Sequence, residues 1–305
     1  MKFLVILISL IINYLWLKDF DRFDDAWFFR FRKRMEEAVA SIDAGQLRWI
    51  AGLGLIYGIP LASLGLLLWF IDGTALGLPT MLVHILVLLI AFDRTQPGQM
   101  AKEFLQYWQA GDQDACIEHL KETLCGNSRH WDPDKSLSEQ FSELFVYRFF
   151  ERMFVMFFWY MLAGPLGILF AYISYQLRDS HEQDQNAEEV GFIELLIAIL
   201  EWLPVRLLAL TFSLAGNFVR CFESFKAALW TFDRQANTAE MLYAYARCAL
   251  TGVIGLVEPD PEAEETAEEL ERRQQAREME ALVALMERSQ AIWLVLLALL
   301  TIFAL

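Results

Sequence analysis

The sequence lacks the short motifs that mark many catalytic centres. It contains no G-x-x-x-x-G-K-[ST] phosphate-binding loop, no H-E-x-x-H zinc helix, no G-x-S-x-G nucleophile turn and no G-x-G-x-x-G dinucleotide loop. Histidine, the side chain whose charge most often changes near neutral pH, occurs only 4 times in 305 residues. We therefore expect a protein without a catalytic residue and without a bound cofactor.

Positive charge is also in deficit. Lysine and arginine total 25 residues against 40 aspartates and glutamates, which gives a formal net charge of −15 at pH 7. Proteins that bind nucleic acids present clusters of positive charge to the phosphate backbone. The deficit argues against a nucleic-acid partner.

Apolar residues, in contrast, are abundant and make up 56% of the chain. Two runs carry no charged side chain, 23 residues at 49–71 and 25 residues at 153–177. A helix needs about 20 apolar residues to cross the ~30 Å hydrocarbon core of a bilayer. Neither run has the polar face that a surface helix of a soluble protein shows. Both are predicted to be transmembrane helices, which makes the lipid bilayer the first expected partner.

Four further apolar segments complete the predicted topology, namely 3–17, 78–92, 190–219 and 290–305. Lysine and arginine cluster in three of the connecting segments, namely 18–48, 93–152 and 220–289. The positive-inside rule places such segments in the cytoplasm. We therefore predict an all-α, polytopic membrane protein with about six transmembrane helices, both termini outside, in a bacterial inner membrane.

This topology divides the chain into five regions. They are 1–92 with three transmembrane helices and the basic cytoplasmic loop 18–48, the cytoplasmic helical segment 93–152, 153–219 with the fourth and fifth transmembrane helices, the cytoplasmic helical segment 220–289, and the final transmembrane helix 290–305. Within 93–152, Asp112 is a candidate N-cap, and Ser136 with Glu139 has the spacing of a capping box. The eight carboxylates of 258–271 lack a calcium-loop pattern, so we interpret them as a solvated helix rather than a cation site.

The four cysteines all fall in segments predicted to be cytoplasmic, at Cys116, Cys125, Cys221 and Cys248. Thiols stay reduced in the cytoplasm, so no disulfide framework is expected. Cys116, His119, Cys125 and His130 can be written as a C-x2-H-x5-C-x4-H zinc site, but this spacing is not among the usual ones. We favour structural thiols and surface histidines, and we expect no metal.

Charges inside the apolar segment 190–219 need an explanation, because ionisable groups at bilayer depth are costly and normally have a partner. Glu194 and Glu201 are seven residues apart and share a helix face, and Arg206 can reach Glu201 if Pro204 kinks the chain. Three interpretations stay open here: an ion pair that fixes the fold, a ligand or proton site, and an interfacial helix with charges that reach water.

Two stretches of the sequence resemble the AmpE family. The first is FFWYMLAGP at 157–165, and the second is EWLPVRL at 201–207, which runs into LAGNF at 214–218. The order of the apolar segments also matches this family over essentially the whole chain. The resemblance implies an inner-membrane protein that is encoded alongside the anhydro-muramyl-peptide amidase AmpD and described as a signalling modulator of β-lactamase induction.

The AmpE family is in turn similar to the cobalamin-pathway adenosylcobinamide-phosphate synthases, membrane enzymes that use ATP and magnesium. Where those enzymes have Glu-Asn-x-x-Asp-Gly, this chain has YRFFER at 147–152. Their paired aspartates fall on Ile197 and Ala198, and their Ser-Pro-Asn segment becomes QAN at 235–237. The comparison implies that the scaffold is retained while carboxylates that could hold a metal–phosphate complex are lost.

We interpret the chain as a regulatory membrane protein that binds a ligand or partner, with an ATP-dependent membrane enzyme of the synthase type as the alternative. The candidate binding residues are charged or amide side chains in these motifs and in 190–219, namely Arg148, Glu151, Arg152, Glu194, Glu201, Arg206 and Asn217. The expected protein partner lies in the cytoplasm or the membrane, and homo-oligomerisation stays open.

Overall fold

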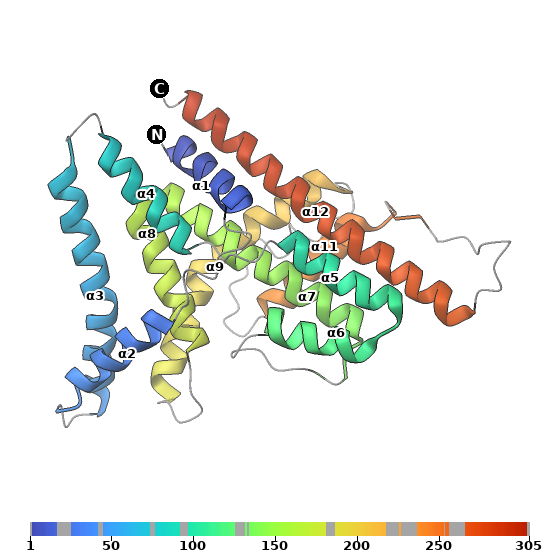
Figure 1. Cartoon of the computed structure of the whole chain (residues 1–305), viewed down its shortest axis with the longest axis horizontal. Coiled ribbons are helices and arrows are strands. Elements are labelled where there is room, and N and C mark those ends of the chain that lie inside the picture. Colours follow the sequence, from blue (N-terminus) through green and yellow to red (C-terminus); the bar gives the residue numbers. More distant parts are fainter. Residues whose placement is uncertain are drawn as a thin grey trace. The chain divides into compact units, whose positions relative to one another are not determined.

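The computed structural model describes residues 2–16, 26–41, 45–73, 77–91, 97–125, 132, 134–180, 187–217, 226, 237–252, 254–255 and 266–303. These residues form helices, and none of them lies in a β-strand (Figure 1). The chain divides into two compact units, Met1–Arg94 with Val155–Leu200 and Thr95–Phe154 with Glu201–Leu305. The predicted all-α class is confirmed.

The first unit is built around one helix that contacts three others. Its helices are α1 (Lys2–Trp16), α2 (Ala26–Ala38), α3 (Gly45–Ile71), α4 (Leu78–Ala91), α8 (Met156–Asp179) and the first part of α9 (Ala187–Ala215). Helix α8 contacts α1, α3 and α4, and α2 packs against α3 (Figure 1). Arg32 of α2 donates a hydrogen bond to the carbonyl oxygen of Ser180, 3.0 Å away. This bond fixes α2 at the end of α8.

Two polar pairs join α8 to its neighbours inside this unit. The hydroxyl oxygens of Tyr57 and Ser174 lie 2.9 Å apart, and Nδ1 of His84 lies 2.9 Å from the hydroxyl oxygen of Tyr160. Tyr160 and Ser174 are fully buried. Because a buried polar group without a partner is costly, these pairs specify which faces of α3 and α4 meet α8.

The glycine and proline of the 157–165 stretch interrupt the regular geometry of α8. Gly164 has a φ of +66°, which glycine adopts without the strain that a Cβ atom would introduce. Pro165, the next residue, has no N–H to contribute to the helix. Gly167 then lies so close to the carbonyl oxygen of Trp159 that a Cβ would overlap it. This part of the motif is thus explained by backbone geometry.

Three helices are long and apolar enough to cross a membrane, at Gln46–Ile71, Leu137–Asp179 and Ala187–Ala215. The third contains the charged segment and Pro204, and its 29 residues are helical throughout. Two shorter apolar helices lie at Phe3–Ile12 and Leu78–Ala91. The structure therefore supports a membrane protein with three candidate spans, and the count of six stays a prediction.

The second unit combines short and long helices. They are α5 (Pro97–Ala110), α6 (Gln113–Leu120), the π-helical turn η2 (Lys121–Cys125), α7 (Leu137–Phe149), the π-helical turn η3 (Phe150–Val155), α11 (Thr238–Leu250), α12 (Ala267–Phe303) and the rest of α9. Helix α7 contacts α5, α6, α11 and α12, so it is the central element. Phe141 of α7 stacks on Phe104 with a distance of 4.0 Å between ring centroids and on Phe145 with 5.5 Å.

The predicted helix starts in this unit are confirmed. Oδ1 of Asp112 accepts a hydrogen bond from the backbone N–H of Ala115 at 3.0 Å, and α6 begins at the next residue after Asp112. Oγ of Ser136 accepts from the backbone N–H of Glu139 at 3.3 Å, ahead of α7. Both side chains satisfy N–H groups that have no partner inside the helix.

The acidic stretch 258–271 lies only in part within the described residues. From residue 266 onward it begins α12, where the Thr266 hydroxyl accepts from the Glu269 N–H at 3.3 Å and the Glu269 carboxylate accepts from the Thr266 N–H at 2.9 Å. This is a capping box, and Glu269 is exposed. The predicted solvated helix is confirmed for these residues, and residues 258–265 lie outside the described part.

Candidate functional site

Three of the candidate residues, Arg148, Glu151 and Arg152, lie together where α7 passes into η3. Arg148 is 7% exposed and Glu151 only 2%. Nη1 of Arg148 donates to Oε1 of Glu151 across 2.6 Å, and Nε of Arg148 donates to the carbonyl oxygen of Leu124 across 2.9 Å. Nε of Arg152 lies 3.7 Å from the same carboxylate oxygen. The buried pair Arg148 and Glu151, with the half-buried Arg152 beside it, forms a charge cluster at a π-helical turn, a geometry that is common at functional sites.

Glu201 and Arg206 are held by different groups in the second unit. Glu201 is 3% exposed and accepts a hydrogen bond from the hydroxyl of Tyr147 at 2.6 Å. Nη1 of Arg206 donates to the carbonyl oxygen of Trp202 at 2.6 Å, and its guanidinium carbon lies 4.3 Å from the centre of the Trp202 ring. The pairing of Glu201 with Arg206 stays a prediction.

Glu194 differs from Glu201 in its surroundings. It belongs to the first unit and is exposed, whereas Glu201 belongs to the second unit and is buried. The spacing of seven residues therefore does not give the two carboxylates the same environment. Of the two, only Glu201 carries the burial that points to a specific role.

Asn217 forms hydrogen bonds with the C-terminal end of α11. Its backbone N–H donates to the carbonyl oxygen of Ala249 at 2.9 Å, and its amide nitrogen Nδ2 donates to that of Thr251 at 3.3 Å. Gly216 lies so close to Ala249 that a Cβ would overlap its carbonyl oxygen. The glycine and asparagine of LAGNF thus allow α9 to dock on the end of α11.

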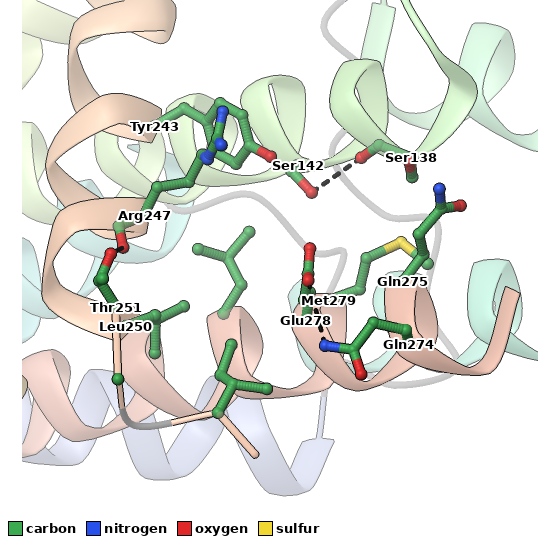
Figure 2. Close-up of a pocket in the computed structure, with 13 residues that line it drawn as sticks. Ser138, Ser142, Tyr243, Arg247, Leu250, Thr251, Gln274, Gln275, Glu278 and Met279 are labelled. Atoms are coloured by element: carbon green, nitrogen blue, oxygen red, sulfur yellow. Dashed lines mark hydrogen bonds between the residues drawn. The ribbon is translucent and has the colours of Figure 1, made fainter. Parts of the chain in front are cut away.

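Close to this docking point, the end of α11 forms one wall of a pocket of about 310 Å³ (Figure 2). Helices α7 and α12 supply the other walls. Most of its side chains carry a hydroxyl, an amide or a charge, namely Ser138, Ser142, Tyr243, Arg247, Thr251, Gln274, Gln275 and Glu278. Leu250, Met279 and Leu282 are buried and add apolar surface. The volume falls at the lower end of the range of small-molecule sites.

The polar groups of the pocket are ordered by contacts across it and along its helices. Tyr243 of α11 is hydrogen-bonded to Ser142 of α7, and the guanidinium carbon of Arg247 lies 5.6 Å from the centre of the Tyr243 ring. Nε2 of Gln274 donates to the carboxylate of Glu278 at 3.2 Å (Figure 2). Burial raises the pKa of Tyr243, so its phenol is neutral at pH 7 and available as a hydrogen-bonding group.

An ion network joins two walls of the pocket. Nζ of Lys135 donates to Glu143 of α7 at 2.8 Å and to Glu240 of α11 at 2.9 Å. The hydrogen bond with Glu143 is the main cause of a raised pKa of Lys135, and the bond from Lys135 lowers the pKa of Glu240. Lys135 and Glu240 are therefore charged at pH 7, and the two bonds from Lys135 fix α11 against α7.

Cys116 and His119 of the possible zinc pattern are both buried, so the expected surface position is wrong for His119. Sγ of Cys116 lies 4.0 Å from the carbonyl oxygen of Phe104, and Nε2 of His119 lies 3.1 Å from that of Met100. Burial raises the pKa of Cys116 to about 11, which disfavours the thiolate that a metal needs. The side chains of Cys125 and His130, the other two residues of this pattern, lie outside the described residues. Within the described part of the chain, no cluster of three or more potential metal-binding side chains occurs.

Sequence reasoning missed the pocket. Its polar residues stand four apart on three helices, as Ser138 and Ser142, Tyr243 and Arg247, and Gln274 and Glu278. Such pairs lie on one helix face, but the same spacing is typical of any solvated surface helix. Only the packing of α7, α11 and α12 brings the three faces around one space.

Comparison with known proteins gives one match. A sequence model of a family described as "Regulatory signalling modulator protein AmpE" matches residues 5–305. No curated protein and no solved structure matches the chain. The family match extends over nearly the whole chain, including both apolar stretches singled out above and all the pocket residues. The chain belongs to the AmpE family of regulatory signalling modulators.

Proposed function

We propose that this protein modulates signalling at the bacterial inner membrane by binding a small ligand in the pocket of its second unit. The single observation that carries this proposal is the pocket itself, in which polar side chains from three helices surround one space of ligand size. The proposal includes a role in β-lactamase induction and the topology of six transmembrane helices with 93–152 and 220–289 in the cytoplasm. The pocket residues then face the compartment where a soluble ligand or protein partner is available.

Binding rather than catalysis is supported by the charged groups of the second unit. Glu151 lies in the stretch that replaces the acidic motif of the synthases, and its carboxylate is engaged by Arg148 at 2.6 Å. A carboxylate that is buried and neutralised in this way is a poor ligand for a magnesium–nucleotide complex. In the pocket, Tyr243 is held in its neutral form and so is not a nucleophile.

The proposal is tested by filling the pocket. Gln275→Trp places a large ring in the space from a half-buried position on α12. Glu280→Trp is the matched control, because Glu280 is exposed on the same helix and does not line the pocket. Each variant replaces the protein in its native host, and two quantities are measured: the level of full-length protein in the membrane and the β-lactamase activity after a β-lactam challenge.

We expect both variants to accumulate normally and only Gln275→Trp to give the induction seen when the protein is absent. If Gln275→Trp accumulates normally and induces like the native protein, a ligand in this pocket does not carry the function. If the protein's absence itself leaves induction unchanged, its role in β-lactamase induction is wrong.

A further inference from the structure

The pocket contains one positive and one negative side chain. Arg247 enters it from α11 and Glu278 from α12 (Figure 2). Among the described residues, Arg247 contacts the Tyr243 ring and Glu278 accepts from Gln274, and no ion pair joins the two charges. An arginine and a glutamate that share a pocket without pairing leave both charges available to a ligand.

Tyr243 lies near both charges of the pocket. Arg247 lowers the pKa of this phenol and Glu278 raises it, after the larger effect of burial. Glu139 of α7 also raises it, although it does not line the pocket. Arg247 and Glu278 thus act on the Tyr243 hydroxyl with opposite sign, and Glu139 adds a further negative charge from outside the pocket.

The other lining groups match a molecule with amide groups and a small apolar part. Gln274 and Gln275 each carry an amide donor and an amide acceptor, and their amide nitrogens also donate to Glu278 and Glu271 at 3.2 Å. Met279 and Leu282 are buried beside them and provide apolar contact. A volume of about 310 Å³ limits the ligand to a small molecule.

We propose that the pocket binds a zwitterion of about dipeptide size, with its carboxylate on Arg247, its ammonium group on Glu278 and its peptide group at the glutamines. This inference rests on the proposed function, since it names the chemistry of the ligand that the same pocket takes. A zwitterion can interact with both Arg247 and Glu278, whereas a neutral sugar or a simple anion cannot use both charges.

The experiment measures binding to the purified full-length protein in nanodiscs by isothermal titration calorimetry. The probe is glycyl-L-leucine. Two analogues each remove one charge: N-acetyl-glycyl-L-leucine lacks the ammonium group, and glycyl-L-leucinamide lacks the carboxylate. Glucose serves as a neutral polar molecule of similar size. We expect the dipeptide to bind with a dissociation constant of about 1 mM or tighter, as is typical of so few atoms.

Variants then assign each charge to its partner. Arg247→Gln is expected to weaken binding of the dipeptide about tenfold or more and to leave binding of the amide unchanged. Glu278→Gln is expected to weaken the dipeptide similarly and to leave the N-acetyl analogue unchanged. Arg277→Gln, an exposed position outside the pocket, is the control and should bind the dipeptide like the native protein.

Three results would overturn this proposal. They are equal binding of all three peptides, binding of glucose as tight as that of the dipeptide, and no binding of the dipeptide at 10 mM, a concentration about tenfold above the expected dissociation constant. These outcomes leave the proposed function intact if Gln275→Trp still gives the induction seen when the protein is absent. The proposed function fails separately, when Gln275→Trp accumulates and induces normally, whatever the peptides do.

Discussion

Removing one partner of the buried charge cluster should destabilise the second unit strongly. Glu151→Ala deletes the carboxylate that accepts from Arg148 at 2.6 Å and that lies 3.7 Å from Arg152. Both Arg148 and Glu151 are more than nine-tenths buried, so water does not replace the lost charge easily. Breaking such a pair costs about 3–5 kcal/mol. Because single domains are stable by only about 5–15 kcal/mol, this loss is a large part of the total.

The assay is thermal unfolding of the purified protein in detergent, followed by the fluorescence of its tryptophans or by size-exclusion chromatography after heating. A loss of 3–5 kcal/mol corresponds to a decrease in Tm of roughly 10 °C for a unit of this size. Glu122→Ala, at an exposed position on η2, is the control and should shift Tm little. The double variant Arg148→Met with Glu151→Leu removes both charges and should recover most of the stability, since no buried charge is then left without its partner.

The reasoning is refuted if Glu151→Ala unfolds within about 2 °C of the native protein, since that decrease corresponds to no more than about 1 kcal/mol. It is also refuted if the double variant is less stable than Glu151→Ala by an amount that simply adds the cost of losing Arg148. The first result would mean that the cluster contributes little to the stability of the fold, and the second that Arg148 and Glu151 do not interact.

Three further outcomes are expected. A membrane-impermeant thiol reagent applied to spheroplasts should leave the half-buried Cys248 unlabelled until the cells are permeabilised, and immediate labelling would overturn the six-span topology. Glu201→Ala and Arg206→Ala should each lower the level of folded protein in immunoblots of membranes, and replacing both with apolar residues should restore much of it. Normal levels of both single variants would show that the two groups do not pair. Lys135→Met should reduce the free energy of unfolding by about 1 kcal/mol at pH 7. Because the pKa of Glu240 is lowered in the folded state, this difference should shrink in acid melts as the pH falls below about 4.5, and a pH-independent difference would contradict it.

Local features of the fold were predictable because they depend on residues close in sequence. Asp112 and Ser136 cap their helices as expected, since an N-cap needs only a side-chain oxygen and the N–H two or three residues later. The uncharged runs at 49–71 and 153–177 lie in two of the helices that are long enough to span a membrane. Helix α4, in contrast, has 14 residues, or about 21 Å at a rise of ~1.5 Å per residue, which is short of a ~30 Å hydrocarbon core. Hydropathy alone therefore does not decide whether such a helix crosses the membrane.

The contacts of the candidate residues were less predictable because they depend on packing over long sequence separations. Glu201 accepts from Tyr147, 54 residues away, although its nearest basic residue in sequence is Arg206. The π-helical turn that carries Glu151 has no sequence pattern of its own, since it differs from an α-helix by a single inserted residue. Tertiary packing decides both features.

The two stretches that resemble the AmpE family owe much of their pattern to backbone geometry. Gly164 adopts a positive φ ahead of a proline, and Gly216 permits the close approach of α9 to α11. Family membership therefore reports the scaffold more directly than it reports the ligand. The charged pocket residues Arg247 and Glu278 lie outside these stretches, on helices whose exposed faces tolerate many side chains. Two proteins can thus share both stretches and the same helical arrangement while their pockets bind different molecules. For this chain, we therefore expect the pocket side chains rather than the family motifs to determine which ligand binds.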